Sequence, residues 1–239
     1  MTWSIVAHDP ASGALAVAVA TCAFAVGAHC PYVRSGVGAV STQSITNRYL
    51  GPAILDLMAR GVDPATAINS ALTADHGREL RQVHAVDRHG RTAASTGRHC
   101  VEYCGDRTGP QFSVAGNMLA GEAVLAATVA AFAGGDELAL PERLISALEA
   151  GERAGGDRRG RQSAALLLTT SEDFADLDLR VDDHADPLGE LARLLGIWRR
   201  GWPQRAAWAP SKANPSGATD LDAIEAAWRA QGLNLRFRR

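Results

Sequence analysis

The second residue of the chain is a threonine, and it opens an apolar stretch, Thr2–Ala7. If Met1 is removed, Thr2 carries a hydroxyl and a free α-amine on one residue. The amine has a reference pKa of about 7.7–8.0, so near neutral pH it can act as a base toward its own side chain. Such a residue can attack a carbonyl and form an ester acyl-enzyme. Only Met1 precedes Thr2, so we expect methionine excision to suffice; the competing interpretation is an ordinary residue at the start of a strand.

Two more polar residues are predicted to take part in the chemistry. Ser4 lies on the same face of the expected strand as Thr2, because side chains in a strand alternate with a period of two. Asn117 follows another expected strand, beside Gly116, where a side-chain amide could hold an oxyanion. The catalytic set is therefore Thr2, Ser4 and Asn117. For Asn117 the alternative is turn capping, and for Ser4 it is a hydrogen bond at a strand edge.

Six polar or charged residues are predicted to bind substrate. Some follow strands that are expected to end in a cleft, and others lie in a glycine- and arginine-rich loop that could bind a carboxylate through an arginine fork. The set is Arg34, Gln43, Asn47, Arg161, Gln162 and Asp183. The alternatives are a solvated arginine, turn caps, salt bridges from the acidic segment Asp182–His184 to Arg161, and a helix cap from Asp186.

Cysteines and histidines offer a rival interpretation as a zinc hydrolase. The candidates are Cys22, His29, Cys30, His99, Cys100 and Cys104. A zinc site needs roughly four converging nitrogen or sulfur ligands, but Cys22 and Cys30 are far apart and the chain contains no C-x-x-C motif. Free buried thiols are favoured. We therefore predict no metal ligand and no cofactor.

Composition indicates an ordinary globular protein. The chain has 239 residues, 46% of them hydrophobic, and a net charge of −2, which argues against a general nucleic-acid binder. The longest apolar run, 14–28, is shorter than the ~20 residues of a membrane-spanning helix and does not resemble a signal peptide. We expect a cytoplasmic protein, off the membrane, with a small-molecule substrate. Its alanine-rich helices also suggest a homo-oligomer.

The order of expected elements indicates an α+β fold. Strands are expected at 2–7, 14–21, 37–43, 82–87, 91–96, 112–115, 163–169 and 177–181, and helices at 51–60, 63–75, 120–132, 141–150 and 187–198. This is not βαβ alternation, so antiparallel sheets covered by helices are favoured. We predict a four-layer α/β/β/α sandwich over residues 1–198. Residues 199–239 are expected to form a linker and a short C-terminal helix.

Several motifs together resemble one family. They include Thr2–Ala7 with Asp9-Pro10, Gly36–Val40, Gly116-Asn117, Gly155–Ala165 and Leu179–His184. Over residues 2 to about 197 the chain is similar to the bacterial domain-of-unknown-function family ten-twenty-eight, which is placed in the Ntn-hydrolase superfamily. The resemblance implies the four-layer sandwich and cleavage of an amide, peptide or ureido bond in a small molecule. The alternative it leaves is a non-catalytic ligand-binding or scaffold protein.

The end of the chain has a separate resemblance. Residues 226–236 are similar to part of a peptidoglycan-binding module that some members of that family carry. Too little of the module is present to predict peptidoglycan binding.

Overall fold

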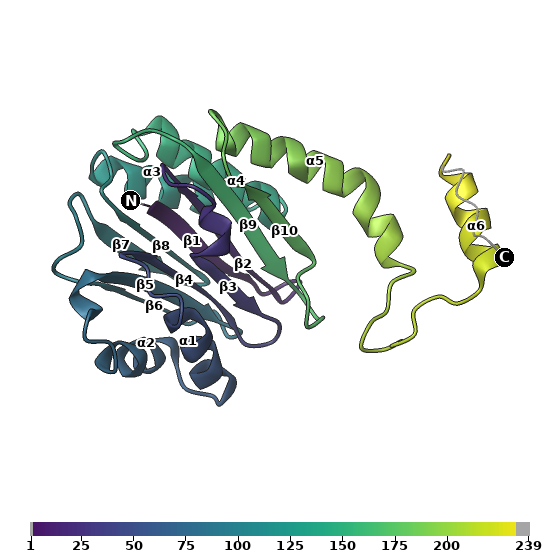
Figure 1. Ribbon diagram of the computed structural model, residues 1–239, viewed down its shortest axis with the longest axis horizontal. Coiled ribbons are helices and arrows are strands. Elements are labelled where there is room, and N and C mark those ends of the chain that lie inside the picture. The colour runs from purple at the N-terminus through teal and green to yellow at the C-terminus, as the bar shows by residue number, and fades with distance from the viewer. Residues whose placement is uncertain (1, 233–239) are drawn as a thin grey trace. The chain divides into compact units, whose positions relative to one another are not determined.

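Two antiparallel sheets form the centre of the molecule (Figure 1). The computed structural model describes residues 2–232, and the chain divides into two compact units, Met1–Leu194 and Leu195–Arg239. All ten strands belong to the first unit. The last residues that resemble the peptidoglycan-binding module, 233–236, lie outside the described residues.

The larger sheet has six strands in the order β10-β9-β2-β1-β8-β7, so β1 lies near its middle. Its strands are β1 (Thr2–Asp9), β2 (Ala14–Thr21), β7 (Gly105–Gly109), β8 (Phe112–Asn117), β9 (Ser163–Thr169) and β10 (Leu177–Val181). The smaller sheet has the order β3-β4-β5-β6, with β3 (Pro31–Arg34), β4 (Gly38–Ser44), β5 (Arg81–Asp87) and β6 (Thr92–Thr96). The two sheets pack face to face, mainly through β1 against β4 and β5 against β8.

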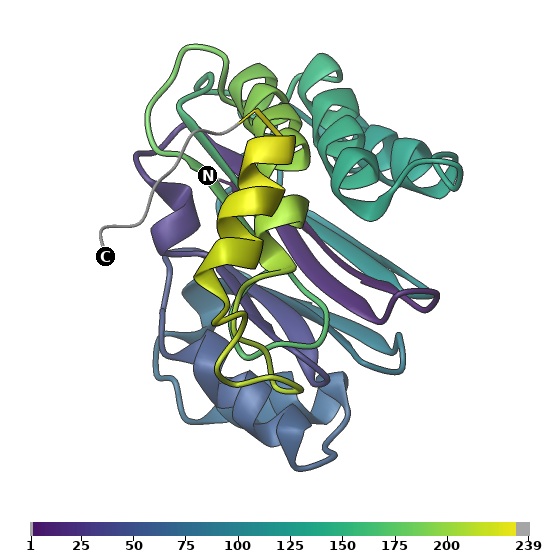
Figure 2. The same cartoon turned by 90° about the vertical axis from the view of Figure 1, so that its right-hand side faces the viewer.

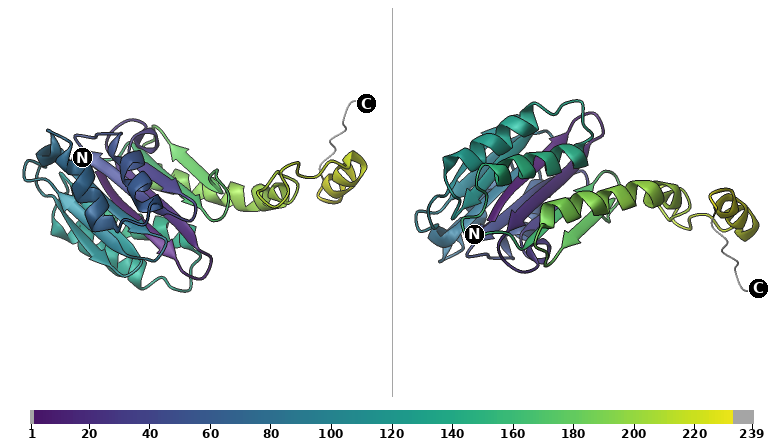
Figure 3. Two further views of the ribbon diagram at one scale, coloured as in Figure 1. Left: turned by 90° about the horizontal axis from the view of Figure 1, so that it is seen from below. Right: turned by 90° about the horizontal axis from the view of Figure 1, so that it is seen from above.

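Helices cover the outer face of each sheet (Figures 2 and 3). Helices α1 (Leu50–Ala59) and α2 (Pro64–Thr73) pack on the smaller sheet, and α3 (Glu122–Ala133) and α4 (Leu140–Arg153) pack on the larger one. Two short 3-10 turns, η1 (Val26–Ala28) and η2 (Arg78–Leu80), lie between strands. The predicted α/β/β/α sandwich is confirmed. The other helices are α5 (Pro187–Ala206), which continues into the second unit, and α6 (Leu221–Ala230) within it.

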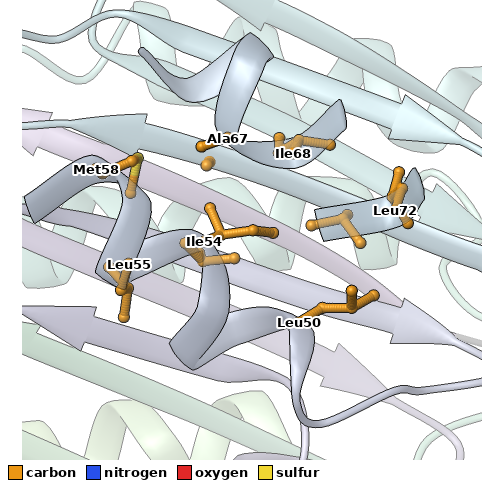
Figure 4. Close-up of a cluster of buried hydrophobic side chains, with 10 residues drawn as sticks. Leu50, Ile54, Leu55, Met58, Ala67, Ile68 and Leu72 are labelled. Carbon is orange, nitrogen blue, oxygen red and sulfur yellow. The ribbon is translucent and has the colours of Figure 1, made fainter. Parts of the chain in front are cut away.

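An apolar layer holds α1 and α2 on their sheet (Figure 4). Asp63 begins α2 by accepting a hydrogen bond from the backbone N–H of Thr66, with Pro64 in the first turn. The buried residues that α1 and α2 contribute then meet the outward-facing side of β4 and β5. This layer consists of Val40, Leu50, Ile54, Leu55, Met58, Ala67, Ile68, Leu72, Val83 and Ala85.

On the larger sheet, Trp3 anchors the beginning of β1 to α4. The indole is 2% exposed and lies on the helix-covered face, opposite to Thr2 and Ser4. A Cβ at Gly151 would lie 3.0 Å from Nε1 of Trp3, and a Cβ at Gly156 would lie 3.4 Å from its ring. The two glycines therefore give the indole room, and the packing fixes the position of the residue beside Thr2.

Two strands were not expected from the sequence. Strand β3 has only four residues and begins with a proline, and β7 has the composition of a turn, Gly105-Asp106-Arg107-Thr108-Gly109. Both lie at sheet edges, where one side of the strand needs no partner and the sequence is less constrained. Within residues 2–232, no helix is both long and apolar enough to span a membrane.

Candidate functional site

Thr2 is the first residue of β1, with β2 on one side and β8 on the other. It lies opposite Asn117 of β8 in the register. Its side chain faces the other sheet, and Oγ1 donates a hydrogen bond to Oγ1 of Thr21 at 3.3 Å. The residue is 6% exposed. Its hydroxyl therefore lies at one end of the layer between the two sheets.

Two buried side-chain amides hold the backbone of Thr2. Nε2 of Gln43 and Nδ2 of Asn117 each donate to the carbonyl oxygen of Thr2 at 3.4 Å. Ser44 and Met118 follow them directly, and both have left-handed backbones, with φ of 73° and 52°. A left-handed conformation costs a residue other than glycine roughly 1–2 kcal/mol. Backbone strain of this kind is often found at functional sites. Here the two strained residues lie where β4 and β8 end, directly after the two amides.

Gln82 joins the two amides and was not anticipated from the sequence. It is fully buried on β5, opposite Gln43 in the register. Its Oε1 accepts hydrogen bonds from Nε2 of Gln43 at 2.9 Å and from Nδ2 of Asn117 at 3.0 Å. Side chains from β4, β5 and β8 thus converge behind Thr2.

Ser4 belongs to the same network but lies deeper. Its Oγ is 2.7 Å from Oε1 of Gln43, 2.7 Å from Nε2 of His84 and 3.0 Å from Oγ of Ser41. Ser4 has no exposed surface, so a substrate cannot reach it. Burial lowers the pKa of His84 to about 3, which keeps the imidazole neutral at physiological pH. His84 and Ser41, like Gln82, were missed by the sequence analysis.

The layer between the sheets has two different halves. Away from Thr2 it is an apolar cluster of Val6, Leu15, Val17, Ala39 and Val86. Toward Thr2 it contains a network of hydrogen-bonded polar side chains from β1, β4, β5 and β8, among them Ser4, Gln43, Gln82 and Asn117. A buried polar group costs a few kcal/mol unless it is hydrogen-bonded, and apolar residues would fill this space at least as stably. The polar half therefore marks the Thr2 end of the sandwich as the candidate site.

Arg34 and Asn47 are held in other interactions. The guanidinium of Arg34 pairs with Asp56 at 2.8 Å, and both side chains are exposed. Nδ2 of Asn47 donates to Oδ2 of Asp75 at 2.8 Å, and its Oδ1 accepts from the backbone N–H of Tyr49. Both residues are expected substrate ligands that the structure places in local hydrogen-bond groups.

Gln162 lies closer to Thr2. Its backbone N–H donates to the carbonyl of Thr21 at 3.0 Å, and its side chain donates to Oδ1 of Asp183 at 3.1 Å. Arg161 is half-exposed and lies 3.5 Å from Glu152 and 3.7 Å from Asp186. Two carboxylates already face Arg161, so a substrate carboxylate would have to compete with them. Within the acidic segment, Asp182 pairs with Arg180 at 3.2 Å and Asp183 accepts from Gln162, so the segment pairs with these two side chains and not with Arg161.

The same loop contains a buried acid that the sequence analysis did not single out. Asp157 is 5% exposed, accepts a hydrogen bond from the backbone N–H of Cys22 at 2.7 Å and pairs with Arg159 at 3.2 Å. The carboxylate ties the loop after α4 to the end of β2, next to Thr21. The signal for it was the segment Gly155-Gly156-Asp157, in which an acid follows two glycines.

The described residues contain no cluster of three or more histidine, cysteine, aspartate or glutamate side chains able to hold a metal ion. The four cysteines are free thiols. Burial raises the pKa of Cys30 to about 12, so this thiol is not a nucleophile near neutral pH.

A cavity lies at the opposite end of β1. It measures about 620 Å³ and is lined by His8, Asp9, Gln111, Phe112, Phe132 and Arg143 among others. It contains none of the predicted site residues. Its arginine is already engaged, because Arg143 lies over the Phe132 ring and pairs with Asp136 at 2.6 Å.

Comparison with known proteins gives one strong relationship. The model of a family of unknown function, DUF1028, matches residues 2–191. The crystal structure of protein SPO2555 from Silicibacter pomeroyi, described as a DUF1028 protein, is 32% identical with a TM-score of 0.86, covering 92% of this chain and 96% of its own.

Other likenesses are much weaker. Anbu, the ancestral β-subunit, from Yersinia bercovieri is 11% identical with a TM-score of 0.38, covering 87% of this chain and 98% of its own. Anbu from Hyphomicrobium sp. strain MC1 is 11% identical with a TM-score of 0.41, covering 89% and 99%. These two scores are too low to support an argument, and no curated protein matches. The family match and the Silicibacter structure are sufficient by themselves: the chain belongs to the DUF1028 family.

Proposed function

We propose that this chain is an amide hydrolase of the N-terminal-nucleophile type, with Thr2 as the nucleophile and a small amide, peptide or ureido compound as substrate. The observation that carries the proposal is the position of Thr2. It begins a central strand of the larger sheet, and its backbone carbonyl is held by two buried amides on two other strands.

The chemistry needs only groups that Thr2 itself supplies, once Met1 is removed. Oγ1 attacks the substrate carbonyl carbon while the α-amine takes the hydroxyl proton. The C–N bond of the tetrahedral intermediate then breaks, and the amine passes the proton to the leaving nitrogen. Water cleaves the resulting ester, which releases the acid and restores Thr2. Gln43 and Asn117 hold the Thr2 backbone in place during both steps.

One observation favours the second function, a non-catalytic ligand-binding or scaffold protein. Thr2 is 94% buried, and the amides behind it are bonded to one another. The network could therefore serve only to fix the register between the two sheets. In that case the Thr2 hydroxyl would not be needed for any reaction.

The rim of the site also supports association of copies of this chain. Large apolar side chains are exposed on loops at the Thr2 end, among them Tyr49 at 86%, Phe24 at 65% and Ile45 at 60%. The backbone N–H of Ile45 donates to the carbonyl of Leu80, which is also exposed. Exposed apolar patches commonly mark interfaces. A homo-oligomer that covers this rim is part of the proposal, and light scattering in solution tests it.

The test of the nucleophile begins with the intact mass of protein purified without an N-terminal tag. A mass lacking one methionine shows that the Thr2 amine is released. The protein is then incubated with a panel of simple amides, dipeptides and ureido compounds, and released amine is measured. Thr2→Ala is expected to lower turnover by about a thousandfold or more, whereas Thr2→Ser keeps the hydroxyl and retains activity. Retention of Met1, where excision is otherwise complete, would exclude this mechanism and favour the second function.

A further inference from the structure

The orientation of the buried amide of Gln82 follows from the backbone around it. Its Nε2 lies 2.8 Å from the carbonyl oxygen of Gly116 and 3.0 Å from that of Gly105. Carbonyl oxygens only accept hydrogen bonds, so the NH2 group of Gln82 must face them. A third contact, 3.0 Å to Oγ1 of Thr96, is on the same side. The oxygen of Gln82 therefore points the other way, toward Gln43 and Asn117.

This orientation decides how Asn117 is turned. Oε1 of Gln82 lies 3.0 Å from the Asn117 amide, and two oxygens at that distance would repel each other. Asn117 must therefore present its NH2 group inward. One of its hydrogens goes to Gln82 and the other to the carbonyl of Thr2. A role for Asn117 as oxyanion donor would require one of these bonds to break.

Gln43 is committed in the same way. Its Nε2 has three acceptors within reach, Oε1 of Gln82 at 2.9 Å, the carbonyl of Ala115 at 3.1 Å and the carbonyl of Thr2 at 3.4 Å, and its two hydrogens are shared among them. Its oxygen accepts from Ser4 at 2.7 Å. Of the two amides behind Thr2, only Asn117 has an oxygen, Oδ1, that accepts no hydrogen bond from residues 2–232. That oxygen faces away from Gln82, on a residue directly opposite Thr2 in the register.

We propose that Gln82 is a positioning residue, which turns the Asn117 carboxamide so that its oxygen accepts a hydrogen bond from the α-amine of Thr2. The inference rests on the proposed function, in which that amine is the base. One N–H held by Asn117 fixes the rotation of the amine about its bond to Cα. The nitrogen lone pair can then point at the proton of Oγ1, as the first step requires. An acceptor at this place also stabilises the protonated amine.

Two buried titratable groups near the site keep one charge state near neutral pH. On β5, His84 is neutral because burial lowers its pKa to about 3. In the loop before β3, the Cys30 thiol stays protonated because burial raises its pKa to about 12. When the Thr2 amine is titrated around pH 8, neither of these groups changes charge, so the measured change comes from the amine.

The test measures the pKa of the Thr2 amine by ¹⁵N NMR and needs no substrate. The full chain is produced from a fusion whose cleavage leaves Thr2 as the first residue, with ¹⁵N-labelled threonine. Asn117→Leu is expected to lower the pKa of the amine by about one pH unit, a tenfold change in its protonation equilibrium. Gln82→Leu is expected to lower it as well, although Asn117 is still present, because its carboxamide is then free to turn.

One variant serves as a control and a second as a substitute. Thr96→Val removes one partner of Gln82 but leaves both backbone carbonyls, so the pKa of the amine should stay at the wild-type value. Gln82→Met removes the same two polar groups from a side chain of similar length, so the same fall in pKa is expected, and it replaces Gln82→Leu if that protein does not fold. The proposal is overturned if Asn117→Leu changes the pKa by less than about 0.2 pH unit, or if Gln82→Leu behaves like Thr96→Val. A protein that shows the expected shifts but hydrolyses no amide refutes the proposed function and leaves this inference standing.

Discussion

His84 is the titratable residue that couples the buried network to pH. Its pKa is about 3 in the folded protein, against about 6.5 for an unfolded chain. Between about pH 3 and pH 6.5, His84 is therefore protonated in the unfolded state and neutral in the folded state. The contribution of His84 to the free energy of unfolding is fully present above about pH 6.5 and is lost as the pH falls toward 3.

We expect this residue to lower the free energy of unfolding by about 2 kcal/mol between pH 6.5 and pH 5. Urea unfolding at both pH values measures the change, and a His84→Asn variant should lose that part of the pH dependence. NMR provides a direct control in the unaltered protein: the His84 ring signals should not titrate between about pH 8 and pH 5. A midpoint near 6.5 for His84 would contradict the prediction.

Among single residues, the sequence predicts part of the candidate site. Thr2, Ser4, Gln43 and Asn117 are brought together as the alternation of side chains on β1 and the ends of β4 and β8 suggest. Gln82 and His84 were missed because polar residues alternating with Val83 and Ala85 are also typical of a solvent-exposed face. Only the second sheet, which covers that face, makes them interior. The sequence of one strand does not show which of its two faces a distant sheet will cover.

Among the elements, the contact of α1 with β3 depends on a glycine. Gly51 lies in the first turn of α1, and a Cβ there would overlap the ring of Tyr32 on β3, 2.5 Å from its Cγ. We expect Gly51→Ala to destabilise the protein by roughly 1–3 kcal/mol, because the helix must move away from the strand. Thermal or urea unfolding measures the loss.

Gly196, in α5, provides the matched control. A Cβ there meets only Nη1 of Arg200, at an ordinary 3.6 Å. Alanine is a better helix former than glycine by roughly 1 kcal/mol, so Gly196→Ala should be neutral or stabilising. Equal effects of the two substitutions would show that the contact with Tyr32 is unimportant.

The elements themselves were largely predictable, and the exceptions have physical reasons. Strong turn and cap signals, such as Asp9–Gly13 and Asp63-Pro64, place the first hairpin and α2 correctly. The edge strands β3 and β7 lack the apolar alternation of a central strand, so they read as loops. Side chains of both sheets meet in the network of Ser4, Gln43 and Gln82, which only the assembled sandwich reveals.

For the molecule as a whole, both sheets and their covering helices belong to the unit Met1–Leu194. Helix α5 contributes buried leucines, Leu188, Leu191 and Leu195, all of them before Trp198. In α6, Ile224 is the one buried residue among those described. The buried apolar residues of the unit Met1–Leu194, Leu188 and Leu191 among them, are therefore all present in a chain that ends at Trp198.

We expect such a shortened chain, 1–198, to fold and to unfold cooperatively within about 4 °C of the full-length protein. Calorimetry measures the difference, and the pKa of the Thr2 amine shows whether the site is intact. A second chain that ends at Asp186 also loses Leu188, Leu191 and Leu195, each worth roughly 1.5–3 kcal/mol of burial, and should be much less stable. If neither shortened chain folds, residues beyond Trp198 are part of the folding unit, and the boundary expected from the sequence is wrong.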